Sequence, residues 1–293
     1  MNCLPDFATI CRPDVSLAPY TWYRLGGPAR WFAEPRDEAE LSLLLSEAVS
    51  RGIAWRVLGR GANLLVRDGG FDGLVIHLSG QHFERIEIDE SGLTAGAAAD
   101  FPRLIRKAIA GQRVGLEALA GIPGSFGGIL RMNAGGKYGE IGAFVESVDV
   151  VRADGSRASL PHAAVNFRYR KTDLGGCVIV AGRLRLPTGD AEAALLRHRD
   201  VWNEKAASQP AVAERSCGCI FKNPPGRSAG KLLDEAGLKG AAVGGARISE
   251  RHANFIVATE GATAADVLNL IAQAQERVRS TAGVDLQLEV EIW

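Results

Sequence analysis

The sequence lacks any apolar run of the roughly 20 residues that a helix needs to cross a bilayer. It also lacks a net charge, because 34 Lys and Arg residues balance 34 Asp and Glu residues. A chain without an excess of either sign has no overall attraction to nucleic acid or to an anionic membrane. We therefore expect neither as a partner, and any anionic ligand must be bound by donors that are placed locally.

The cysteines lack the pattern of a disulfide framework, since their number is odd and their spacing irregular. Reduced thiols in a cytoplasmic protein explain them better. No second Cys or His pair accompanies Cys217 and Cys219, so we expect no metal site. Residues 1–12 include Asp6 and no sustained apolar stretch, which argues against a signal peptide. The five cysteines are Cys3, Cys11, Cys177, Cys217 and Cys219.

Glycine is the residue in excess. The 293 residues are 46% hydrophobic and 23% charged, as in an ordinary globular protein of two or three domains. The 35 glycines, however, gather in clusters. Such clusters mark sharp turns or a close approach of the backbone to a ligand. They lie at 59–73, 121–128, 135–142 and 237–245.

Capping residues predict where the helices begin. Asp37 starts one that runs to about Arg51, and Asp100, Ser228 and Thr263 start three more. A charged helix over 190–207 marks a break before a distinct C-terminal unit. Strands are predicted at 55–58, 74–78, 145–152, 178–186, 254–258 and 285–292, with a hairpin turn at Asp154-Gly155. The class is α+β, and the order of strands in the sheets is left open.

Two glycine-rich loops carry the strongest chemical indication. The first, Leu58 to Gly70, lies between two predicted strands, where successive N–H groups can surround phosphate oxygens. It differs from a dinucleotide fingerprint, because Leu64 replaces the third glycine and no helix follows. The second, Ala120 to Gly135, combines glycines, a proline and apolar residues. Each loop alone could be a tight connection, but together they suit a ligand with a pyrophosphate.

With five further segments, these loops resemble the UDP-N-acetylenolpyruvoylglucosamine reductase family, in the shorter type that lacks a tyrosine-bearing insertion. The resemblance implies a two-part FAD-binding region of the vanillyl-alcohol-oxidase-like (PCMH) fold and a C-terminal α+β substrate-binding domain. The implied domains are 1–79, 80–188 and 189–293. The further segments are 21–29, 218–224, 228–240, 248–257 and 286–292.

The resemblance also implies the cofactors and the reaction. Reduced nicotinamide, as NADPH, passes hydride to FAD, and the flavin then reduces the enolpyruvyl ether of UDP-N-acetylglucosamine enolpyruvate. The product, UDP-N-acetylmuramate, is a precursor of peptidoglycan, and no obligate protein partner is implied. The implied FAD contacts are Gly59, Arg60, Gly61, Ala62, Asn63, Leu64, Gly121, Ile122, Pro123, Gly124, Ser125, Gly127, Gly128, Asn133, Ala134 and Gly135.

Three positions match the catalytic residues of the family. Arg170 falls on the arginine that binds the carboxylate, and Glu289 on the catalytic glutamate. Cys219 stands where most members carry a proton-donating serine. A thiol, with an ordinary pKa of about 8.5, gives up a proton more readily than a hydroxyl. Tyr169, Lys222 and Asn223 are the implied substrate contacts.

Alternatives remain beside this hypothesis. Cys219 could be a small buried residue without a role, and Lys222 with Asn223 a solvated turn. Cys217 and His252 are expected to be structural. Glu291 stands where the family usually has an arginine that helps to hold substrate. The chain could instead be an oxidase or dehydrogenase of the same fold, or a flavin or UDP-sugar binder that has lost catalysis.

Overall fold

The computed structural model describes residues 7, 9–211 and 213–293. The expectations for Cys3 and Asp6 lie outside the described residues. The chain divides into two compact units, each built from three segments. The first unit contains the chain up to Pro13, Trp31–Arg60 and Asp72–Lys205, and the second contains Asp14–Arg30, Gly61–Phe71 and Ala206–Trp293. The domain boundaries expected at 79/80 and 188/189 stay a prediction.

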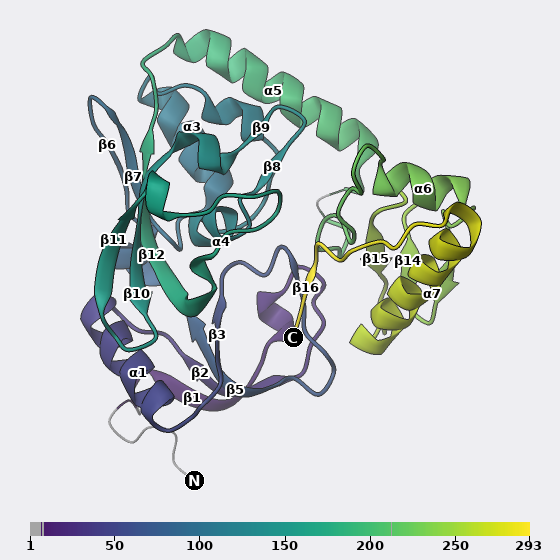
Figure 1. Cartoon of the computed structure of the whole chain (residues 1–293), viewed down its shortest axis with the longest axis horizontal. Helices are drawn as coiled ribbons and strands as arrows, with labels where there is room; N and C mark the ends of the chain where they lie inside the picture. The colour runs from purple at the N-terminus through teal and green to yellow at the C-terminus, as the bar shows by residue number, and fades with distance from the viewer. Residues whose placement is uncertain (1–6, 8, 212) are drawn as a thin grey trace. The chain divides into compact units, whose positions relative to one another are not determined.

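A five-stranded antiparallel sheet lies in the first unit, in the order β11-β10-β12-β7-β6. The predicted hairpin is confirmed, because β10 and β11 pair and Gly155 turns between them with φ +81°. Helices α3 and α4 lie beside this sheet in Figure 1. The bounds are β6 Ile86–Ile88, β7 Gly92–Gly96, β10 Val145–Arg152, β11 Arg157–Pro161, β12 Cys177–Arg185, α3 Phe101–Ala110 and α4 Phe126–Arg131.

A second sheet has the order β1-β2-β5-β3, with β3 and β5 parallel and Trp55 opposite Leu74. The predicted helix α1 connects β2 to β3, and Asp37 caps it by accepting from the N–H of Glu40. The bounds are β1 Cys11–Ser16, β2 Pro28–Ala33, α1 Glu38–Ser50, β3 Trp55–Leu58, β5 Phe71–His77 and α2 Gly80–Glu84. Within the described residues, 3-10 helices span Ala18–Tyr20, Leu116–Leu119, Ile141–Phe144, His162–Ala164 and Leu174–Gly176.

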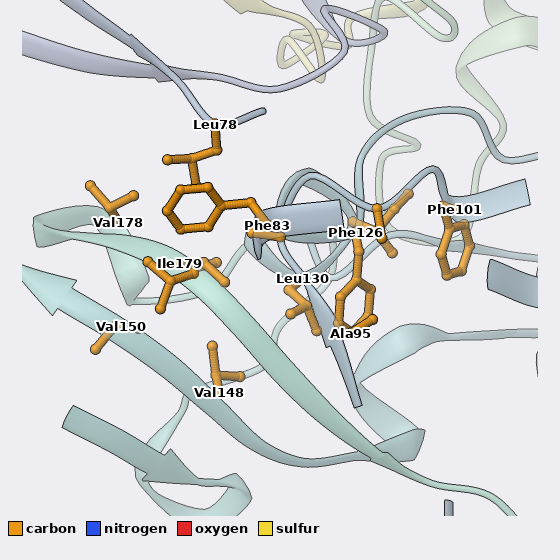
Figure 2. Packing of buried hydrophobic residues seen from close by; sticks show 14 of the residues in the cluster. Leu78, Phe83, Ala95, Phe101, Phe126, Leu130, Val148, Val150, Val178 and Ile179 are labelled. Atoms are coloured by element: carbon orange, nitrogen blue, oxygen red, sulfur yellow. The ribbon is translucent and has the colours of Figure 1, made fainter. Parts of the chain in front are cut away.

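The core of the first unit lies between its sheets and helices. Figure 2 shows three phenylalanines, Phe83, Phe101 and Phe126, which belong to the same core cluster as aliphatic side chains of β10 and β12. All three are fully buried. Two further elements complete this unit: the short hairpin β8 (Gly135–Gly136) and β9 (Gly139–Glu140), and the long helix α5 (Ala191–Ser208).

The second unit has a core of its own around helices α6 and α7 and the sheet β13-β14-β15. The predicted start of α7 is confirmed, since Thr263 and Asp266 form a reciprocal capping box. Strand β16 pairs in parallel with β4. The bounds are β4 Leu64–Leu65, α6 Ala229–Glu235, β13 Ala242–Val243, β14 Ala246–Ile248, β15 Ile256–Ala258, α7 Ala264–Ala282 and β16 Glu291–Ile292.

The prediction of a continuous strand over 285–292 is wrong, because β16 has only two residues. The preceding residues divide their backbone bonds among several partners. Lys222 donates its N–H to the carbonyl of Gln287, and Glu289 donates its own to Ile220. The alternation of apolar residues records burial of Leu286 and Val290 rather than a regular ladder.

Within the described ranges, no helix is both long enough and apolar enough to traverse a bilayer. The same part of the chain holds no group of three His, Cys, Asp or Glu side chains arranged to bind a metal ion.

Candidate active site

The two glycine-rich loops meet in the first unit at Gly59 and Ser125. A Cβ atom added to Gly59 would lie 2.3 Å from the Oγ of Ser125, so a larger residue there would require the Ser125 side chain to move. Asp100 ties the loops together, because it bridges to Ser125 and pairs with Arg60, with 3.3 Å between Nε and Oδ2. The start of the first glycine loop and the second glycine loop, which are distant in sequence, therefore lie close together in this unit.

Glycines of the second loop serve two purposes. Gly127 is required by packing, since its added Cβ would lie 2.8 Å from that of Ala97. Gly128 is different, because the only atom near its added Cβ is the Oγ of Ser125 at 3.4 Å, an ordinary contact. Gly121 and Gly124 turn the chain at φ +75° and +131°. Gly128 thus leaves its backbone uncovered for a reason other than packing, which is compatible with contact to the pyrophosphate of FAD.

The first loop continues into the second unit at Gly61. An added Cβ there would lie 2.1 Å from the carbonyl oxygen of Tyr20, and φ is +63°. Trp22 donates its N–H to the Gly61 carbonyl. Asn63 donates its side-chain amide to the carbonyl of Glu289, at 3.0 Å. Residues 20–22 thus contact the loop at Gly61, and the segment that contains the predicted catalytic residue Glu289 contacts it at Asn63.

Arg170 occupies a strained turn in the first unit. Arg168 and Lys171 exchange both backbone hydrogen bonds across the turn, and Arg170 has φ +54°. A non-glycine residue in this region costs of the order of 1–3 kcal/mol and persists only when its surroundings hold it. The guanidinium of Arg170 donates to the carbonyl of Gly135 at 2.8 Å and lies 5.0 Å from the centre of the Tyr169 ring.

The side chain of Asn133 stabilises the turn at Arg170 through hydrogen bonds. Its side chain is completely buried, accepts from the N–H of Gly142 at 2.9 Å and donates to the carbonyl of Arg168 at 3.1 Å. Thr172 adds a hydrogen bond to the carbonyl of Arg131. The second glycine loop and the Arg170 turn are therefore one connected piece of structure, although some 30 residues separate them in sequence.

Cys219 and Glu289 belong to neighbouring segments of the second unit. Glu289 donates its N–H to the carbonyl of Ile220, the residue after Cys219, at 2.8 Å. Phe221 and Leu288 form an antiparallel bridge next to this bond. Cys219 is a residue of intermediate burial. The structure therefore brings two of the three predicted catalytic residues together in this unit, and places Arg170 with Tyr169 in the other.

Asn254 is a positioning residue that sequence reasoning did not identify. Its buried side chain accepts from the N–H of Phe221 at 2.9 Å and donates to the carbonyl of the same residue at 2.8 Å. Its own carbonyl accepts from Ile220. A polar residue within the apolar run Ala253–Ile256 is the indication that could have revealed it, because a buried amide must find partners.

Cys217 has a different environment from Cys219. It is 1% exposed, and burial raises the pKa of its thiol to about 12, against an opposing effect of its hydrogen bond with the Tyr23 hydroxyl. This supports the expected structural role. His252 is likewise held, since its Nδ1 accepts from the N–H of Asn254 and its ring packs edge-on against Phe255.

The predicted substrate contacts Lys222 and Asn223 follow directly after the Cys219 segment. Lys222 is half-buried, and its backbone bonds to Gln287. Asn223 is exposed, and its side-chain oxygen accepts from the N–H of Ala229 at the start of α6. Glu291 is exposed, while its backbone N–H donates to the carbonyl of Asn63. The presence of glutamate at 291, where the family usually has arginine, therefore leaves the backbone pairing of β16 intact.

Comparison with known proteins agrees with these observations. The family profile described as "UDP-N-acetylenolpyruvoylglucosamine reductase, C-terminal domain" matches residues 209–293, and the profile "FAD binding domain" matches residues 29–160. A curated UDP-N-acetylenolpyruvoylglucosamine reductase from Heliobacterium modesticaldum is 42% identical over 290 residues, which cover 98% of this chain and 92% of that protein. A relative of the same name from Methylorubrum extorquens is 40% identical over 288 residues, with 98% and 93% covered.

A solved structure of the same kind extends the agreement to three dimensions. The crystal structure of UDP-N-acetylenolpyruvylglucosamine reductase from Thermus caldophilus superposes with a TM-score of 0.85 at 39% identity, over 97% of this chain and 99% of that one. The expected α+β class with an FAD-binding region is confirmed. Because the likeness spans both units and almost every residue, this chain belongs to the UDP-N-acetylenolpyruvoylglucosamine reductase family of FAD-binding oxidoreductases.

Proposed function

We propose that this enzyme reduces UDP-N-acetylglucosamine enolpyruvate to UDP-N-acetylmuramate in the cytoplasm, with NADPH as reductant and FAD as the bound cofactor. One observation carries most of the proposal: Glu289 donates its N–H to Ile220, next to Cys219, while its carbonyl accepts from Asn63 of the first glycine loop. A flavin-loop residue, one candidate catalytic residue and the chain neighbour of the other are thus joined by hydrogen bonds. Membership of the family agrees with this assignment.

The residues have distinct proposed roles. Bound FAD supplies hydride transfer, from NADPH to the terminal carbon of the enolpyruvyl group. Negative charge then develops on the adjacent carbon and its carboxylate. Arg170 binds that carboxylate through its planar guanidinium, and Glu289 adds a hydrogen bond in its protonated form. Cys219 donates a proton to the adjacent carbon, which completes the reduction.

The turn at Arg170 supports its role. A guanidinium on a flexible exposed side chain would lose conformational entropy on binding a carboxylate. Here the backbone is already held at φ +54°, and the guanidinium is held by the Gly135 carbonyl. A carboxylate that replaces or joins this carbonyl meets a donor group that is already in place, which is the condition for efficient charge stabilisation.

Separating the two half-reactions tests the proposal. The purified protein should show the visible absorbance of oxidised flavin, lose it on anaerobic addition of NADPH, and regain it when the enolpyruvyl nucleotide is added. Cys219→Ala should keep the first step and slow reoxidation by about 10²–10⁴-fold, the usual worth of a positioned acid. Cys219→Ser is the matched control and should reoxidise, because it restores the residue usual in the family.

Three results would contradict the proposal. If the protein lacks flavin absorbance even after incubation with FAD, then FAD is not its cofactor. Wild-type protein that accepts hydride but is not reoxidised by the nucleotide would point to another substrate for the same fold. Reoxidation of Cys219→Ala at the wild-type rate would assign the proton donor to a different group.

A further inference from the structure

Side chains in the last turns of helix α5 contact the start of the second glycine loop. The ammonium of Lys205 donates to the carbonyl of Ala120 at 2.6 Å. Its aliphatic stem covers the next residue, since a Cβ added to Gly121 would lie 3.0 Å from the Cδ of Lys205 and 3.8 Å from the Cδ1 of Trp202. A charged donor on a backbone carbonyl makes a stronger hydrogen bond than a neutral one.

The neighbouring residue, Glu204, binds two side chains near residue 138, at the other end of the segment that begins at Ala120. One of its carboxylate oxygens accepts from the ammonium of Lys137 at 2.9 Å, and the other accepts from the hydroxyl of Tyr138. These contacts hold the pKa of Glu204 below its ordinary value, through Tyr138 first and then Lys137. Lys137 and Tyr138 form the tip of the hairpin β8–β9, so the carboxylate anchors that tip.

The hairpin in turn supports Arg170. Gly135, the first residue of β8, pairs with Glu140 and provides the carbonyl that accepts from the Arg170 guanidinium. The hairpin is tight, because a Cβ added to Gly135 would lie 2.4 Å from the carbonyl oxygen of Gly139. A shift of the tip therefore moves the carbonyl that holds Arg170. The path from Glu204 to Arg170 consists of the hairpin tip, its two short strands and one hydrogen bond.

We propose that Glu204 and Lys205 are positioning residues, which clamp both ends of the segment 120–138 and so set the position of Arg170 and of the second glycine loop. The proposal rests on the function proposed above, for the identity of the substrate and cofactor. Neither residue has to touch either ligand. An exposed ion pair contributes little to stability by itself, so the expected effects are on binding rather than on folding.

Substitution of Glu204 gives the sharper test. Glu204→Ala should raise KM for UDP-N-acetylglucosamine enolpyruvate about tenfold, equivalent to about 1.4 kcal/mol, and leave flavin reduction by NADPH unchanged. The dissociation constant of this nucleotide, measured from the change it causes in the oxidised-flavin spectrum, should rise by the same factor. Tyr138→Phe, which keeps the ring and removes one of the two donors, should give a smaller rise. Asp200→Ala, exposed one turn earlier on α5, is the control that makes the same charge change.

Lys205 tests the other end of the clamp. Lys205→Met keeps an apolar stem over Gly121 and removes the donor from the Ala120 carbonyl. It should raise the dissociation constant of FAD, followed by quenching of flavin fluorescence, by about tenfold. An Asp200→Ala protein should retain FAD as the wild type does.

Hydrogen–deuterium exchange separates failure of the clamp from failure of the proposed function. Glu204→Ala should speed amide exchange in 135–140 and 167–171 relative to wild type and Asp200→Ala, whatever substrate the enzyme uses. If wild-type protein is not reoxidised by the nucleotide, the proposed function fails while this readout still decides the clamp. Unchanged exchange with unchanged KM, or equal changes in Asp200→Ala, would overturn the inference.

Discussion

Two thiols one residue apart show how far a local environment determines chemistry. Cys219 is partly exposed in the segment that Asn254 and Glu289 hold, whereas Cys217 is buried against Tyr23. A thiol that reacts must reach solvent and ionise, and burial opposes both. The pattern Cys-Gly-Cys gives no hint of this difference, because it depends on which face each side chain presents to the core. The sequence therefore identifies both residues as cysteines, but their different roles depend on the environment that the fold provides.

Burial of Cys217 predicts a loss of stability at alkaline pH. Burial raises the pKa of this thiol from its ordinary value, near 9, to about 12 in the folded chain. Above about pH 9 the unfolded state therefore loses a proton that the folded state keeps, so the stabilisation is complete below pH 9 and is lost as the pH rises. The free energy of unfolding should fall by up to about 1.4 kcal/mol per pH unit from this group. Tyr23, whose pKa burial also raises, acts in the same direction above pH 10.

Urea unfolding between pH 7 and pH 10.5 measures this effect. Cys217→Ala should lower stability at pH 7 but show a shallower decline above pH 9 than the wild type. Parallel pH profiles for the two proteins would show that the Cys217 thiol does not contribute to the decline. Iodoacetamide at pH 8 should meanwhile modify Cys219 and spare Cys217 in the native protein, as peptide mapping by mass spectrometry can establish.

Helix starts were the most predictable elements, because each depends on one capping side chain and its near neighbours. Asp37, Asp100, Ser228 and Thr263 all accept from an N–H three residues later, as expected. The final strand was predicted wrongly, since its backbone partners are distant in sequence and divided between the segment around Phe221 and strand β4. Lys205 and Asn254 could not be identified from spacing either, for their hydrogen bonds reach Ala120 and Phe221. Local rules predict elements, and long-range contacts build the candidate site.

Several side chains cap the N-terminus of helix α7, and their contribution to the free energy of unfolding can be measured. Besides the capping box, the carboxylate of Asp68 accepts from Ala264 and Ala265, at 2.9 and 3.0 Å. A negative charge is stabilising at this end of a helix. Asp68→Ala should therefore lower the free energy of unfolding by about 1–2 kcal/mol. Glu260→Ala, exposed and just before the helix, should change it by less than about 0.5 kcal/mol.

Thermal or urea unfolding of the single and double variants completes this test. Thr263→Ala should cost about 1 kcal/mol. The double variant Asp68→Ala/Thr263→Ala should differ from the sum of the two, because both side chains satisfy donors of the same turn and share the same electrostatic field. Strict additivity, or an Asp68 effect no larger than that of Glu260, would mean that Asp68 is not an effective cap.

The whole chain is not assembled from consecutive segments. Its second unit takes Asp14–Arg30 and Gly61–Phe71 from the N-terminal part of the sequence. Tyr23 and Leu65 are fully buried in the core of this unit, and the Tyr23 hydroxyl donates to the carbonyl of Ile256. The first glycine loop passes from one unit to the other between Arg60 and Gly61. Composition and motif order gave no indication of this exchange, since each segment is locally ordinary.

This arrangement predicts that a fragment of residues 189–293 does not fold alone. Removal of one large buried side chain costs about 3–5 kcal/mol, and a domain has only about 5–15 kcal/mol of stability. Loss of Tyr23, Leu25 and Leu65 together, with their backbone, should exceed that margin. The fragment should show no cooperative thermal transition by circular dichroism and poor dispersion in its amide NMR spectrum. Co-expression with residues 1–188 is the control and should restore both, because it returns the missing segments. A cooperative transition of the isolated fragment would show that residues 189–293 contain a sufficient core of their own.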